Sequence, residues 1–166
     1  MIGAIALVVV NVFALPWAIW KPFVSPASIS ACSVLPASAL ERVFPSGAVR
    51  SGDGPVCSVG PAGQAGGRPR LEVTLIGDGI VGAVRAHEDG LRRDAAEHVV
   101  RPVSSVGDAA YSWVSIESLG VFNAEVNGRM GGHRLRVSIW GPAAVSAADA
   151  EALAVSVAGA VARQVR

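Results

Sequence analysis

Charge of either sign is scarce in this chain of 166 residues. Only 16% of the residues are charged, and 14 Lys and Arg are balanced by 13 Asp and Glu, which leaves a formal net charge of +1. So small a net charge creates no basic field for nucleic acid, and we expect no nucleic-acid partner. The length allows one domain of ordinary size and a short appendage, but not two full domains.

Motifs of catalysis and metal binding are also missing. The chain has no Gly-x-Ser-x-Gly, no His-Glu-x-x-His and no phosphate-binding Gly-x-x-x-x-Gly-Lys-Ser/Thr. Of its three histidines, His87 and His98 lie eleven residues apart on one predicted helix, whose middle Gly90 weakens, and His133 lies on a predicted strand, whereas a zinc site needs more ligands than two histidines would provide. We therefore expect no enzyme activity, no bound metal and no catalytic residues.

One glycine pattern is a candidate for cofactor binding. Residues 77–82 read Gly-Asp-Gly-Ile-Val-Gly between a predicted strand and a predicted helix. In dinucleotide-binding folds this spacing lets pyrophosphate approach a helix N-terminus. However, 19 glycines make such a spacing common by chance, no acidic residue ends the extended segment that follows, and the later strands form hairpins instead of parallel βαβ units. The pattern favours a glycine-rich turn, and no cofactor is expected.

Apolar residues, by contrast, are abundant, and a mean hydropathy of +0.46 is high for a soluble protein. They are concentrated from Ile2 to Trp20, a run without charge that only Asn11 and Pro16 interrupt. At about 1.5 Å per residue, a helix of this length matches the hydrocarbon core of a bilayer. We predict a transmembrane helix within residues 1–21. An uncleaved anchor fits better than a cleaved signal peptide, because positive charge before the run and a clear cleavage site after it are missing.

The two cysteines bear on which side of the membrane the remainder lies. Lys21 follows the apolar run and by itself would favour the inside. A Cys32–Cys57 disulfide would stabilise the chain by roughly 3.5 kcal/mol through loop closure, and such a bond persists outside the cytosol. We therefore predict a single-pass protein of the cell membrane whose domain faces outside. Two alternatives remain open, because Ile29-Ser30-Ala31-Cys32 resembles a lipobox whose Cys is lipidated, and both thiols could be free.

After a Pro/Ser/Ala stalk at residues 22–31, residues 32–166 are expected to form one extracytoplasmic domain. Periodicity and turn residues predict helices at 36–44, 80–98 and 147–164, strands at 56–59, 70–76, 110–116, 121–127 and 133–140, and an extended segment at 99–103. Ser146 and Asp149 have the spacing of a capping box, and Gly90 weakens the middle of its helix. Antiparallel strands with helices on their faces indicate an α+β fold with a sheet of about five strands.

Aromatic residues make up only 5% of the chain. Tyr111, Trp113, Phe122 and Trp140 lie on neighbouring predicted strands, so they either line an apolar pocket or pack in the core.

Three charged residues near these strands are further candidates. Arg134 and Arg136 share one face of a strand, which is either solvated or contacts an anionic lipid or a partner. Asp108 follows Gly107, and we interpret it as a turn residue that binds its own backbone rather than as a catalytic carboxylate.

Several short motifs point to a known family. Cys32-Ser33-Val34-Leu35 precedes a short predicted helix, Cys57 lies on the next strand, and residues 103–111 read Val-Ser-Ser-Val-Gly-Asp-Ala-Ala-Tyr. Over residues 32–166 this pattern resembles the actinobacterial envelope lipoproteins with the "domain of unknown function 3558" and, more loosely, PsbP-like α/β sandwiches. The resemblance implies an envelope location and a Cys32–Cys57 disulfide. It implies no reaction, and the chain departs from the pattern in its anchor.

Together these features predict a non-enzymatic ligand-binding or interaction module of the actinobacterial cell envelope, anchored in the membrane. The alternative is an accessory structural subunit of a membrane protein complex that docks through the transmembrane helix. Asn11, Ala14 and Ala18 share one face of that helix and would suit contact with a neighbouring helix.

Overall fold

Seven antiparallel strands and three helices make up the part of the chain that the computed structural model describes, which is residues 29–63, 68–116, 121–141 and 146–165. This confirms the predicted α+β class, although the described sheet has seven strands instead of about five. The predicted transmembrane segment at 1–21 and most of the predicted stalk lie outside the described residues. Within the described ranges, no helix is both long enough and apolar enough to cross a membrane.

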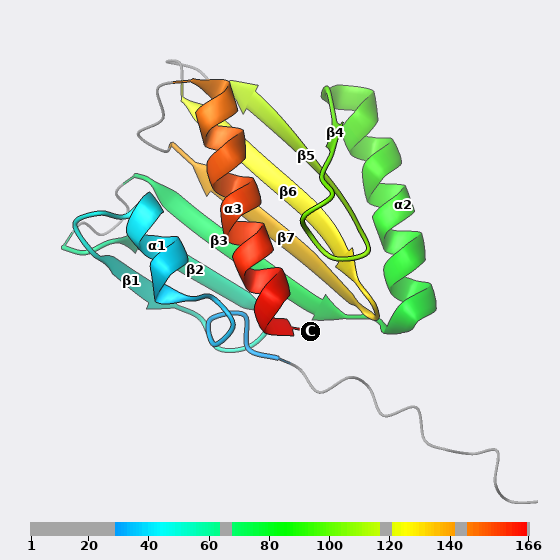
Figure 1. Ribbon diagram of the computed structural model, residues 1–166, viewed down its shortest axis with the longest axis horizontal. Coiled ribbons are helices and arrows are strands. Elements are labelled where there is room, and N and C mark those ends of the chain that lie inside the picture. The colour runs from blue at the N-terminus through cyan, green and yellow to red at the C-terminus, as the bar shows by residue number, and fades with distance from the viewer. Residues whose placement is uncertain (1–28, 64–67, 117–120, 142–145, 166) are drawn as a thin grey trace, which may run out of the picture.

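The strands lie in the order β1-β2-β3-β7-β6-β5-β4 (Figure 1). Their bounds are β1 Ala48–Ser51, β2 Val56–Pro61, β3 Arg70–Gly77, β4 Arg101–Pro102, β5 Ala109–Ile116, β6 Phe122–Met130 and β7 His133–Trp140. The helices are α1 Ala37–Val43, α2 Gly79–Glu97 and α3 Ala147–Val165. The two strands beyond the expected five are β1, which was not predicted, and the short β4. Both are edge strands.

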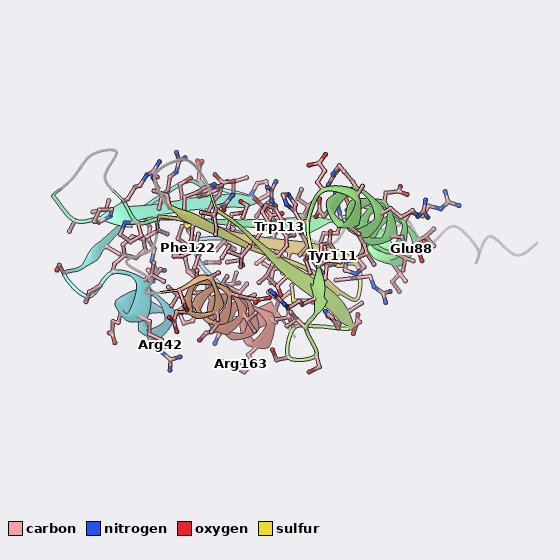
Figure 2. All side chains as sticks on the ribbon, turned by 90° about the horizontal axis from the view of Figure 1, so that it is seen from above. Arg42, Glu88, Tyr111, Trp113, Phe122 and Arg163 are labelled. Carbon is pink, nitrogen blue, oxygen red and sulfur yellow. A yellow bond between two sulfur atoms is a disulfide. The ribbon has the colours of Figure 1, made fainter. Side chains whose placement is uncertain are left out.

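One face of the sheet carries the main hydrophobic core. Leu135, Val137 and Ile139 alternate along the central strand β7 and are almost completely buried. Their register partners on β3 and β6 continue this apolar layer, as Val73 and Val126 do on either side of Val137. Helices α1 and α3 cover this face, whereas α2 lies on the other side of the sheet (Figure 2). As the capping box predicts, the Asp149 N–H donates to Ser146 Oγ at the start of α3.

A disulfide bond joins Cys32, in the segment before α1, to Cys57 on β2, as the sequence predicted. The same segment is held by a hydrogen bond from the Ala31 N–H to the Gly54 carbonyl and by Arg50, which donates to the Cys32 carbonyl. Cys57 is fully buried on its strand. The bond therefore fixes the beginning of the described chain to one end of the sheet.

Asp108 lies in the turn before β5, but the prediction that it binds the backbone of its own turn was wrong. Its carboxylate does not bind its own turn but accepts the backbone N–H of Gly131, in the turn between β6 and β7. The Asp108 N–H donates to the Arg129 carbonyl at 2.7 Å. Gly107 adopts a φ of +60° directly against the Arg129 backbone, where a Cβ atom would overlap the carbonyl oxygen. The Gly-Asp pair thus docks this loop onto the β6–β7 hairpin.

Removal of the disulfide should destabilise the folded domain. Because the bond closes a loop of 25 residues, we expect the Cys32→Ala/Cys57→Ala variant to lose roughly 3.5 kcal/mol of unfolding free energy. Urea denaturation followed by circular dichroism measures this loss. A reducing agent should destabilise the native chain by a similar amount and leave the double variant unchanged, and equal stability of all three samples would contradict the structural role.

The two glycines that meet at the Asp108 contact should respond differently to alanine. Gly131 has a φ of +56° but open space where a Cβ atom would lie, so Gly131→Ala should cost roughly 1 kcal/mol for the left-handed backbone alone. Gly107→Ala adds a collision with the Arg129 backbone and should cost roughly 3 kcal/mol or more. Urea denaturation of the two variants compares these costs, and equal losses would refute the close contact.

Candidate functional site

A cleft of about 550 Å³ lies between α2 and the sheet, on the face opposite the main core. Its floor comes from β3, β5, β6 and β7, and α2 forms its wall. The cleft exists because α2 contacts the sheet sparingly, burying only Ala83, Gly90 and Asp94 along its length. Polar and titratable side chains dominate the lining, which includes Thr74, His87, Arg93, Asp94, Glu97, His98, Tyr111, Trp113, Glu125, Asn127, Arg134 and Arg136.

Glu125 is the polar centre of the cleft floor. Only 4% of its side chain is exposed, because it lies on the interior strand β6 between the register partners Trp113 and Ser138. Its carboxylate accepts hydrogen bonds from Arg136 at 2.5 Å, from Asn127 at 2.8 Å and from the Ser138 hydroxyl at 3.1 Å. A buried carboxylate is tolerable only when it is neutralised and hydrogen-bonded in this way.

Asp94 supplies the corresponding carboxylate from the helix. Its Oδ2 atom accepts the Tyr111 hydroxyl at 2.9 Å and the Asn127 amide at 3.2 Å, and Arg93 lies 3.5 Å from Oδ1. The Asn127 Nδ2 group therefore donates to both Asp94 and Glu125, one on α2 and the other on β6. This shared amide links the helix to the sheet through polar contacts.

Two arginines of β7 occupy the same side of the cleft. Arg134 forms an ion pair with Asp78, the residue that precedes α2, and Arg136 forms its pair with Glu125. Burial lowers the pKa of Arg136, but the hydrogen bond and the charge of Glu125 outweigh it, and the pKa is raised overall. Arg136 therefore remains cationic, and each of the two arginines is held by one carboxylate.

Aromatic rings line the cleft between α2 and β5. The imidazole of His98 stacks on the indole of Trp113, with ring centroids 4.1 Å apart, and His87 lies 5.3 Å from Tyr111. Burial, together with the charge of Arg129, lowers the pKa of His87, which keeps it neutral near pH 7. The Trp113 Nε1 group is buried, and among the described residues it has no hydrogen-bond acceptor. Buried indole N–H groups usually find a partner.

The four aromatic residues suggested as a pocket do not line one cavity. Tyr111 and Trp113 both line the cleft. Phe122 faces the main core on the opposite side of the sheet, where it is paired with Ile116. Trp140 shares the cleft face, but it lies at the far end of β7 under Arg70, whose guanidinium carbon is 5.9 Å from its ring centroid.

The polar groups of the cleft were largely missed by sequence reasoning. Asp94, Glu125 and Asn127 were not singled out, although Glu125 and Asn127 alternate with the buried Ala124 and Val126 along β6. That alternation could have placed both side chains on the face opposite the core. Arg136 was singled out with Arg134, and both line the cleft.

The glycine pattern at residues 77–82 joins β3 to α2. Gly77 ends the strand, Gly79 begins the helix, and the side chain of Asp78 between them binds Arg134. The neighbours of β3 are β2 and β7, and both are antiparallel to it. The pattern therefore lies outside the parallel βαβ unit in which such glycines bind pyrophosphate.

Comparisons of this chain with protein-family models, with curated proteins and with solved structures found no match. In the described part of the chain, no group of three or more His, Cys, Asp or Glu side chains is arranged to hold a metal ion. Arguments about function therefore rest on the cleft itself.

Tyr111 is the only tyrosine in the chain, so its ionisation can be followed directly. Burial, and then the hydrogen bond to Asp94, raise its pKa above the ordinary value of 10.0. We expect no tyrosinate absorbance from the folded protein as the pH rises past 10, whereas the urea-unfolded chain should titrate near pH 10. Because the raised pKa favours protonated Tyr111 in the folded state, this tyrosine contributes fully to the free energy of unfolding below pH 10, and its contribution declines as the pH rises above 10. Reversible ionisation near pH 10 without unfolding would disprove the Tyr111–Asp94 contact.

Proposed function

We propose that this chain is a non-enzymatic binding module of the bacterial cell envelope that holds a small polar molecule in the cleft between α2 and the sheet. The observation that carries the proposal is a hydrogen-bonded network around two buried carboxylates, Glu125 and Asp94, in a cleft of about 550 Å³. Ligand sites commonly occupy about 300–1,000 Å³ and place a few convergent polar groups on a preformed surface. The membrane anchor, the outward orientation and the relationship to the envelope lipoproteins form part of the same proposal.

The composition of the cleft supports binding over simple packing. A helix that only covered a sheet would present an apolar stripe to it. Instead α2 directs Asp94 inward, and its other two buried positions are the small residues Ala83 and Gly90. Buried carboxylates weaken a fold unless they are fully compensated, and an apolar replacement is often neutral or stabilising. A function that needs polar groups at this place accounts for their presence.

The hydrogen-bonding pattern favours binding over catalysis. The carboxylates of Glu125 and Asp94 are already occupied by donors from the protein, and Tyr111 donates its proton to Asp94. A nucleophile activated by a base that a third group orients is the usual catalytic arrangement. In the cleft the titratable groups compensate one another instead, which suits recognition of a ligand.

Filling the cleft should abolish binding. Ala86 lines the cleft, whereas Ala96 lies exposed on the same helix, so Ala86→Phe and Ala96→Phe form a matched pair. We expect at least one compound from a panel of sugars, amino acids, dicarboxylic acids and phosphate to raise the Tm of the full chain. At one hundred times its Kd, a ligand adds about 2.7 kcal/mol, which corresponds to roughly 5–10 °C.

The same compound should raise the Tm of Ala96→Phe equally and leave that of Ala86→Phe unchanged. A compound that stabilises both variants would bind elsewhere and would contradict the proposal. If no class of compound stabilises the native chain, the cleft is not a binding site for a small polar molecule.

A further inference from the structure

The charges that line the cleft cancel. Three acidic and three basic residues line it, namely Asp94, Glu97, Glu125, Arg93, Arg134 and Arg136. Each arginine is already paired with a carboxylate, because Arg93 lies beside Asp94, Arg136 beside Glu125 and Arg134 beside Asp78, which does not line the cleft. Glu97 is the lining carboxylate outside these pairs, and it is exposed, so solvent screens its charge. A charged ligand would therefore bring an uncompensated charge next to groups that already compensate one another. This balance favours a ligand without net charge.

Hydrogen-bonding capacity remains after these pairs have formed. Arg134 and Arg136 use one N–H group each in the described contacts, and a guanidinium has five. The Asn127 Oδ1 atom is an acceptor for which no donor is found among the described residues, and the carboxylates keep unused lone pairs. Unused donors and acceptors thus both belong to the lining of the cleft. A hydroxyl group both donates and accepts, so neighbouring hydroxyls on one ring could bind both kinds of group.

Two aromatic side chains of the lining, Tyr111 and Trp113, border this polar network and are 4% and 8% exposed. His87 and His98 are packed against them. A sugar ring has the same mixed character, because its hydroxyls form a polar rim and its C–H groups form an apolar face. The indole N–H of Trp113 lacks an acceptor within the described residues. A hydroxyl oxygen is the type of acceptor that would satisfy it.

From these three features we infer that the ligand of the cleft is an uncharged saccharide, of one or two sugar rings, bound by Arg136, Asn127 and Asp94 beside the rings of Tyr111 and Trp113. This inference rests on the proposed function and specifies its ligand class. A neutral polyhydroxyl ring would satisfy the remaining donors and acceptors without adding charge.

The test uses the full chain, kept in solution with a polyoxyethylene detergent, because an alkyl glycoside detergent would itself supply a sugar. D-glucose and maltose are titrated as uncharged saccharides, and potassium phosphate and citrate serve as charged probes at constant ionic strength. The readout is the indole N–H signal of Trp113 in ¹H–¹⁵N spectra, which is assigned by its loss in Trp113→Phe. We expect a saturable shift with at least one of the uncharged compounds and none with the charged probes.

Two arginine variants then locate the binding. Arg136→Gln should weaken saccharide binding at least tenfold, because it removes hydrogen-bond donors from the cleft. The Arg136 side chain is half-exposed, so we expect the variant to fold. Arg70→Gln is the matched control, because Arg70 lies on the same face of the sheet, over Trp140 and outside the cleft. The Arg70→Gln variant should bind the saccharide with the affinity of the native chain. Circular dichroism checks that both variants are folded.

The outcomes separate the inference from the proposed function. A Trp113 shift with phosphate or citrate, and none with the uncharged saccharides, would overturn the saccharide class but leave a polar-ligand cleft. If no probe shifts the Trp113 signal and none stabilises the native chain, both proposals fail. A saccharide shift that Arg136→Gln leaves intact would place the sugar elsewhere and would overturn the inference.

Discussion

The two-residue repeat of β7 is the constraint on which the rest of the structure depends. Leu135, Val137 and Ile139 are buried beneath α3, and side chains along a strand alternate between its faces. Arg134 and Arg136 must therefore lie together on the opposite face. The antiparallel partners of β7 continue the pattern, since Asn127 is paired with Arg136 and Glu125 with Ser138. One buried apolar layer thus forces a polar layer behind it, and that layer is the floor of the cleft.

The polar layer requires a helix that does not cover it completely. The sheet itself supplies the donors that compensate Glu125, namely Arg136, Asn127 and Ser138, because an isolated buried carboxylate costs several kcal/mol. The helix contributes a second carboxylate, Asp94, and Asn127 binds both carboxylates. The helix is thereby attached by directional hydrogen bonds and by few apolar contacts. A fold that violates the usual rule of an apolar interface at one place commonly does so where it binds something.

The sequence predicted the elements whose periodicity is long and regular. Strands β3 and β7 and helix α3 alternate or repeat over eight or more residues, and their predicted bounds were nearly correct. Strand β1 was missed because its exposure leaves no apolar alternation, with Val49 57% exposed. The cleft was not predicted because it depends on the order β3-β7-β6-β5 and on α2 crossing to the other face, and neither is a local property. The sequence shows only that Glu125 and Asn127 alternate with the apolar residues Ala124 and Val126, and so lie on the opposite face of the strand.

Gly90 shows how the site explains a residue that local rules count as a defect. A glycine in the middle of a helix costs about 1 kcal/mol relative to alanine, and on propensity alone this one weakens α2. In the structure a Cβ atom at this position would meet the Tyr111 hydroxyl at 3.0 Å. That hydroxyl donates to Asp94, one helical turn further along the same face. Because Gly90 has no side chain, the Tyr111 hydroxyl has room to approach α2 and to donate to Asp94. The glycine that weakens α2 is therefore also the residue that permits the Tyr111–Asp94 hydrogen bond.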